Sequence, residues 1–127
     1  MSYKLYFNEI EKCENALVQR LCEYINVHKK GIFYIEDPFV YNKGNKKLIE
    51  SLYRTGFKSL KSIDDNTCIV EISSGCMGLA SAVFILKLEK DNLYIVGYAK
   101  EGLIKQNIYG KALNKIKAVL ENDKAHF

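Results

Sequence analysis

Basic and aromatic side chains lie together in one segment of this chain, residues 28–61. The segment holds eight Lys or Arg against three Asp or Glu, a net charge of +5, while the whole chain carries +4. Six Phe or Tyr residues stand among these cations. Ammonium and guanidinium groups neutralise phosphates, and aromatic rings stack on bases. These residue types therefore favour contact with a nucleic acid.

The elements expected around these residues narrow the candidate site. Pro38 ends a buried strand at 32–35 and opens a loop at 37–47, and a helix follows at 45–55 with Gly56 as its C-terminal stop. Phosphate or partner contacts are expected from this loop, the helix and the turn after it. The predicted contact residues are Lys43, Lys46, Lys47, Arg54, Lys58, Phe39 and Tyr41. The predicted core residues of the same segment are Tyr34, Leu48, Leu52 and Tyr53.

Apolar periodicity gives the rest of the scaffold. Residues 3–7 form either a short strand or a lead into a helix at 9–28, for which Asn8 and Glu11 provide a capping box. Strands are expected at 68–72, 79–88 and 93–99, joined as antiparallel hairpins because their connections are short. A last helix is expected at 103–121. The predicted fold is a single α+β domain, 1–127, with roughly four mostly antiparallel strands and three helices over one face or edge.

Composition limits the class of protein. The chain is 48% hydrophobic and 27% charged, as expected for a soluble globular domain, and +4 is a mild surplus that predicts a local nucleic-acid contact. The first residues contain charges and no apolar core of a signal peptide, and no apolar stretch approaches the roughly 20 residues that span a bilayer. We therefore expect a cytoplasmic protein with no membrane partner.

Catalytic and metal-binding patterns are weak in this sequence. Cys76, in a Gly-flanked bend, could be a nucleophile only with a base nearby, and the histidines are His28 and His126. The four cysteines form no CxxC pair, which indicates reduced, buried thiols. Asp64 and Asp65 precede Asn66 and are typical of a turn. We expect no catalytic residue, no cofactor and no metal.

Two stretches resemble known families. The run Lys105 to Ala112, after a strand and at a helix start, resembles the acetyl-CoA pyrophosphate loop of the GNAT acetyltransferases, with one glycine, Gly110, where that pattern has two. This resemblance implies acetyl-CoA as a ligand. A fainter resemblance, over Leu48 to Ile72, is to the wybutosine-synthesis proteins that act on tRNA, and no residue role follows from it.

Clear structural patterns beside weak catalytic ones favour a binding protein over an enzyme. The first hypothesis is a small non-enzymatic protein that docks on RNA or on a ribonucleoprotein such as the ribosome, with no DNA specificity implied. The alternative is an immunity or antitoxin-type protein that binds one protein target. A GNAT-like acyltransferase is the second alternative.

Overall fold

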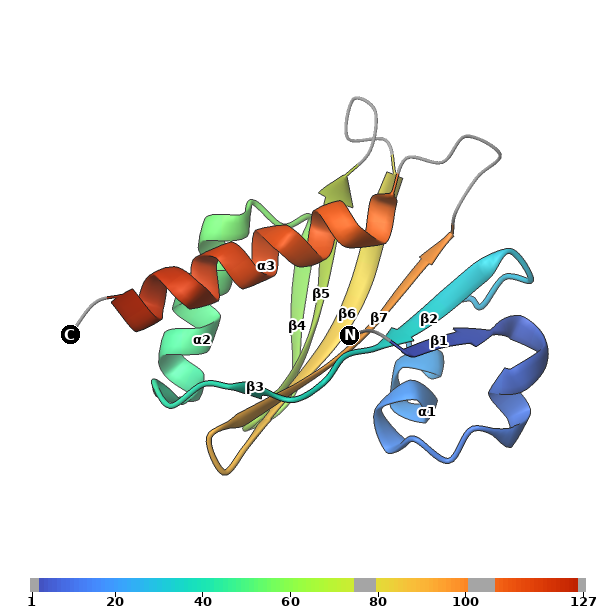
Figure 1. Ribbon diagram of the computed structural model, residues 1–127, viewed down its shortest axis with the longest axis horizontal. Coiled ribbons are helices and arrows are strands. Elements are labelled where there is room, and N and C mark those ends of the chain that lie inside the picture. The colour runs from blue at the N-terminus through green and yellow to red at the C-terminus, as the bar shows by residue number, and fades with distance from the viewer. Residues whose placement is uncertain (1–2, 75–79, 101–106, 126–127) are drawn as a thin grey trace.

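The apolar segments of the chain assemble into one antiparallel sheet (Figure 1). A computed structural model describes residues 3–74, 80–100 and 107–125. Within these residues the sheet has seven strands. The strands are β1 (Tyr3–Tyr6), β2 (Gly31–Ile35), β3 (Phe39–Val40), β4 (Ser59–Asp64), β5 (Thr67–Ser74), β6 (Ala80–Glu89) and β7 (Asn92–Lys100). Their order is β1-β2-β7-β6-β5-β4, and β3 pairs with β7.

Strands β2 and β3 both pair with β7 and are separated by a short break. Ile35 lies opposite Val96 and Phe39 lies opposite Leu93, so the chain leaves the ladder only around Pro38. Proline has no N–H to donate to a ladder, which explains the break. On the other side of β7, a turn at Lys90 and Asp91 with φ of 49° and 64° closes the hairpin to β6.

Helical layers cover both faces of the sheet. The helices are η1 (Phe7–Lys12), α1 (Ala16–Cys22), α2 (Gly44–Leu52), η2 (Tyr53–Thr55) and α3 (Ile108–Ala125). Side chains alternate between faces along each strand. Ile95 of β7 packs in the core beneath α2 and α3, whereas Val96 packs in the core beneath α1. We call these coverings the α2–α3 layer (α2, η2 and α3) and the η1–α1 layer (η1 and α1).

The predicted α+β class and antiparallel pairing are confirmed, but the predicted number of strands is wrong. Two strands lie where the sequence predicted none: β3 in the expected loop, and β4 in the residues expected only to lead toward a turn. Alternation in β4 is weak because no side chain of this edge strand is fully buried, so its pattern carries little signal. The helices also do not share one face, because α1 lies opposite α2 and α3.

The helix predicted at 9–28 is also wrong, because the chain breaks in its middle. Asn15 accepts hydrogen bonds from the backbone N–H groups of Leu17 (2.9 Å) and Val18 (3.1 Å), which starts a new helix there. The expected capping box at Asn8 is replaced by Glu9, whose carboxylate accepts the N–H of Tyr6 at 3.0 Å. Two short helical segments therefore take the place of one long helix.

The other predicted elements agree more closely with the structure. The helix predicted at 45–55 is α2 continued by η2, and it ends at Gly56 with φ of 70°. The last helix begins at Ile108, five residues later than predicted, after Asn107 with φ of 52°. Cys68 is buried as expected, but Cys13 and Cys22 are half-buried under the η1–α1 layer. No helix in the described ranges has the length and apolar character needed to cross a bilayer.

Candidate nucleic-acid interface

Helix α2 presents one side to the core and the other to solvent. Its buried residues are Leu48, Ser51 and Leu52. The exposed side of the helix and of the turns flanking it carries Lys43, Lys46, Glu50 and Tyr53. These exposed residues recur at spacings of three or four, which places them along one side of a helix. The sequence-predicted lysines therefore lie on an outward-facing stripe.

A buried carboxylate near the end of α3 fixes the rotation of α2. Asp123 is 2% exposed and accepts hydrogen bonds from the hydroxyls of Ser51 and Tyr41, the latter at 2.9 Å. The guanidinium of Arg54 donates to the second Asp123 oxygen at 2.6 Å. Ser51 must face inward to reach this carboxylate. Because successive helical residues are rotated by about 100°, Tyr53 lies about 200° from Ser51 and faces solvent.

The electrostatics of this cluster agree with its geometry. Burial alone would raise the pKa of Asp123, but hydrogen bonds from Ser51, Arg54 and Tyr41, together with the charge of Arg54, hold its pKa below the ordinary value. Burial, and then the hydrogen bond to Asp123, raise the pKa of Tyr41 to about 12. The cluster thus contains an ionised carboxylate and a neutral phenol at neutral pH, an arrangement that links α2, η2 and α3.

Three of the predicted contact residues are available for phosphates. Lys43 and Lys46 are exposed and Lys47 is half-buried. Among the residues that the structure describes, none of the three forms an ion pair. Their ammonium groups can therefore exchange water for phosphate oxygens without first breaking a salt bridge.

Arg54 and Lys58 have carboxylate partners, which sets them apart from these lysines. Arg54 is held by Asp123, and 43% of its side chain remains exposed. Lys58 lies 3.7 Å from Glu71. Glu71 belongs to the same side of β5 as Ile69, which packs beneath α1, so Lys58 is directed toward the opposite face of the sheet. The structure therefore does not bring Lys58 together with the lysines of α2.

The burial of the aromatic residues in this segment differs from the prediction. Tyr41, expected to contact a partner, is 1% exposed, and Phe39 is half-buried against the core of the α2–α3 layer. Tyr53, predicted to lie in the core, is 65% exposed. Its ring packs on Phe57 with centroids 5.1 Å apart. The exposed ring on the lysine-bearing side of α2 is consequently that of Tyr53, with Glu50 between it and Lys46.

Helix α3 adds basic residues to the same layer. Lys111 and Lys115 are exposed and Lys117 is half-buried, on a helix that contacts η2 through the Arg54 hydrogen bond to the carbonyl of Val119. Lys115 also donates to the carbonyl of Ser73 at 2.7 Å. No local pattern in the sequence links these lysines to residues 28–61. Their helical spacing opposite an apolar stripe shows that they face outward, but not which layer they join.

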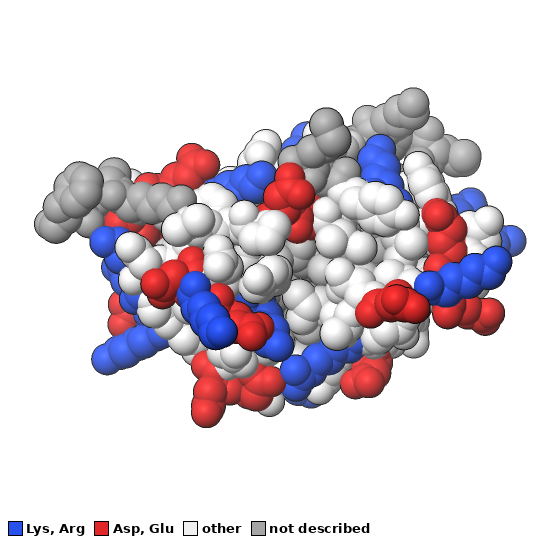
Figure 2. All heavy atoms as spheres, turned by 60° about the horizontal axis from the view of Figure 1, so that its bottom comes forward, with Lys and Arg blue, Asp and Glu red and all other residues white. Residues whose placement is uncertain are grey.

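Charge is not continuous on the face of the molecule that Figure 2 shows. On the side shown in Figure 2, basic and acidic side chains are interspersed and broad uncharged surface lies between them. A polyanion would therefore meet individual lysines there rather than a continuous basic surface.

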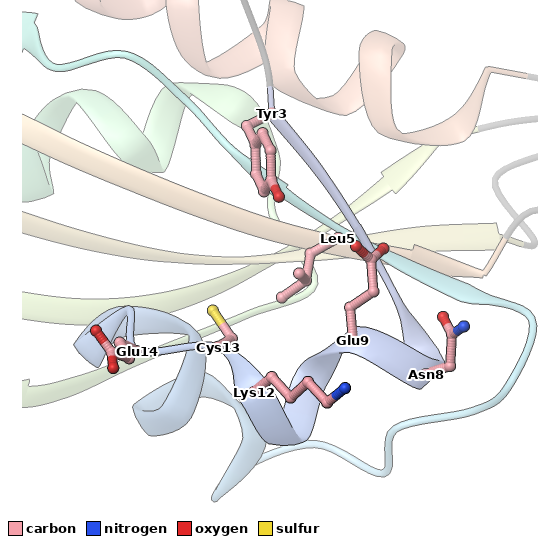
Figure 3. A pocket seen from close by; sticks show the side chains of 7 residues that line it. All are labelled: Tyr3, Leu5, Asn8, Glu9, Lys12, Cys13 and Glu14. Carbon is pink, nitrogen blue, oxygen red and sulfur yellow. The ribbon is translucent and has the colours of Figure 1, made fainter.

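Cavities lie on the other side of the sheet, beside the η1–α1 layer. One of about 590 Å³ separates β1 from η1, and Figure 3 shows Leu5 and Tyr3 on one wall and the Cys13 thiol and Glu9 carboxylate directed toward them. The described lining residues include a thiol but no histidine, which a cysteine nucleophile would need as its base. None of the predicted contact residues lines this cavity.

Other sequence-predicted features divide between the described and undescribed residues. Cys76 and Lys105 lie outside the described residues. Gly110 lies inside α3, where a Cβ atom would come within 2.5 Å of the Asn107 side chain, so its lack of a side chain serves packing. Asp64 accepts the N–H of Asn66 at 3.1 Å, as expected for a turn.

A scan of protein-family models and searches of curated proteins and of solved structures find no significant match to this chain.

Proposed function

We propose that this protein docks on RNA, alone or in a ribonucleoprotein such as the ribosome, through the outer surface of its α2–α3 layer. The observation that carries the proposal is that α2 and α3, distant in sequence, present exposed lysines in one layer. Lys43 and Lys46 come from the α2 side, and Lys111 and Lys115 come from α3. The Asp123 cluster links α2, η2 and α3, the backbone elements of this layer.

The contrast with the opposite layer supports this assignment. Residues 44–55 hold three basic residues and one acidic residue, and α3 holds four basic and two acidic residues. Residues 7–22, which include η1 and α1, hold two basic and three acidic residues. The positive surplus therefore belongs to one covering layer, and phosphate groups are the partner that such a surplus attracts.

Charge reversal tests the proposal. The triple variant K43E/K46E/K47E should lose salt-sensitive association with purified ribosomes and with a fluorescein-labelled oligouridylate. Three fewer phosphate contacts should reduce the slope of log affinity against log salt by about 2. The matched control K12E/K29E/K87E makes the same charge change away from the layer and should bind like wild type. Equal binding by wild type and K43E/K46E/K47E would contradict the proposal.

A protein partner is the second candidate, as for an immunity or antitoxin-type protein. The observation that favours it is on β1, an outer strand of the sheet. Tyr3 (60%), Tyr6 (48%) and Phe7 (47%) are exposed at this strand and just after it. Edge strands and exposed aromatic rings are common docking elements for other proteins. Affinity capture from a lysate with and without nuclease separates the two candidates: a stoichiometric protein that persists after nuclease treatment selects this one.

A further inference from the structure

Tyr53 is an exposed aromatic side chain on the lysine-bearing side of α2. It is 65% exposed and stands two helical turns after Lys46 on the same outward stripe. The buried Ser51–Asp123 hydrogen bond keeps it there, because it turns Ser51 inward and so turns Tyr53 outward. An exposed tyrosine ring offers a flat face for stacking, and Lys46 lies on the same stripe one turn beyond Glu50, so a ligand with both negative charge and a π surface matches this side of the helix.

The ring is supported on one side by the fold. Phe57 is half-buried against the core and its ring lies 5.1 Å from that of Tyr53 at an angle of 52°. Such a tilted pair restricts the motion of an exposed ring. A restricted ring loses less entropy when a flat partner stacks on it, as in other preorganised sites.

We infer that Tyr53 stacks on an unpaired base while Lys43, Lys46 and Lys47 contact the neighbouring phosphates, so that the α2–α3 layer prefers single-stranded RNA to duplex RNA. The inference rests on the proposed function and names the form of RNA that it takes. In a duplex the faces of the bases are covered by their neighbours, and only the backbone and groove edges are accessible. A single strand offers base faces and phosphates together.

Binding measurements with two probes test the inference. The probes are a labelled oligouridylate and a labelled RNA duplex with the same number of phosphates. Wild type should bind the single strand more tightly. Tyr53→Ala should weaken single-strand binding roughly tenfold, the usual effect of removing a stacking ring, and leave duplex binding unchanged. Tyr53→Phe keeps the ring and should bind like wild type.

A matched control and the alternative outcomes complete the test. Tyr94 is 36% exposed on β7 beside α1, and Tyr94→Ala should bind both probes like wild type. If Tyr53→Ala binds the single strand normally, or weakens both probes equally, the stacking inference is wrong. The proposed function fails separately, when wild type binds neither probe or when K43E/K46E/K47E binds like wild type. Loss of a nuclease-resistant protein partner in Tyr53→Ala, with RNA binding unchanged, would also overturn the inference.

Discussion

The α2–α3 layer covers its face of the sheet with a long helix and a shorter one, whereas the η1–α1 layer covers the opposite face with two short segments. Helix α3 alone buries Ile108, Tyr109, Ala112, Leu113, Ile116 and Leu120. Helix α1 fully buries only Val18 and Leu21. Cavities of about 590 and 410 Å³ remain beside η1. In the described residues, α3 thus buries more side chains than α1, and cavities lie beside η1 on the opposite face.

The two layers also differ in how they use polar groups. The α2–α3 layer contains a buried carboxylate with three side-chain donors, and in the described residues no buried side-chain polar atom lacks a partner. In the η1–α1 layer, the Arg20–Asp64 ion pair (2.9 Å) is partly exposed and contributes little to stability. A binding surface is better placed on the layer whose backbone is held by buried contacts, and the lysines of α2 are on that layer.

Truncating a buried leucine should give the largest difference between the layers. Leu120→Ala removes a fully buried side chain of α3, and we expect the free energy of unfolding to fall by about 3 kcal/mol. Leu17→Ala, in the half-buried surface of α1, should cost about 1 kcal/mol. Urea unfolding followed by circular dichroism measures both. Equal losses would show that the η1–α1 layer contributes as much per residue as its counterpart.

Neutralising Asp123 should have the next largest effect. Asp123→Asn keeps the shape but removes the charge that Arg54 faces. It also replaces one carboxylate oxygen with an NH2 group, so either Arg54 or the pair Ser51 and Tyr41 loses its acceptor. We expect a loss of about 2 kcal/mol in the free energy of unfolding. Asp65→Asn, at an exposed position in the turn before β5, is the control and should change it by less than about 0.5 kcal/mol. A stability for Asp123→Asn that matches the control would show that the cluster does not hold the layer together.

Lowering the pH should reduce the difference in free energy of unfolding between wild type and Asp123→Asn. The pKa of Asp123 is lower in the folded protein than its ordinary value of 3.8, so the unfolded chain takes up the proton first as the pH falls. The stabilisation from this carboxylate is therefore present above about pH 4 and is lost as the pH falls through the folded-state pKa. Urea unfolding of wild type and Asp123→Asn at a series of pH values should show the gap narrowing below pH 4. A constant gap would contradict an ionised Asp123 in the folded state.

Removing the N-cap of α1 should have the smallest effect and should be confined to the η1–α1 layer. Asn15→Ala leaves the N–H groups of Leu17 and Val18 without their side-chain acceptor, at a cost of about 1 kcal/mol. Asn15→Asp keeps the acceptor and should be close to wild type. Amide hydrogen exchange should show faster opening in α1 with no change in α3. Equal acceleration in α3 would mean that the two layers unfold as one unit.

Much of the fold could be predicted because its signals are local. Alternation predicted β5, β6 and β7 to within a few residues, and Gly56 stops the helix where a left-handed residue is needed. Strand β4 was missed because an edge strand with exposed sides has no alternation to read. The break between η1 and α1 was missed because the apolar stripe continues past Asn15, and the stripe gives no sign that Asn15 caps a new helix.

The residues of the candidate site were also predicted only in part. Lys43, Lys46 and Lys47 were predicted correctly to lie on a loop and helix, and their phosphate contacts remain a prediction. The burial of Tyr41 and Tyr53 was predicted the wrong way round, because Tyr41 is 1% exposed and Tyr53 is 65% exposed. When the helix is considered alone, its sequence predicts an apolar stripe suitable for burial that consists of Leu48, Ile49, Leu52 and Tyr53. The stripe that the structure buries contains Ser51 instead of Tyr53.

By itself, the sequence determined the α+β class, the antiparallel hairpins and the concentration of positive charge in residues 28–61. Hydrophobic period, turn residues and charge are properties of neighbouring residues, so they can be read without a structure. Only the tertiary structure decided which side of α2 faces outward and that α3, with its lysines, covers the same face of the sheet. The reason is that Asp123, 72 residues after Ser51, supplies the acceptor that draws Ser51 inward and leaves Tyr53 in solvent.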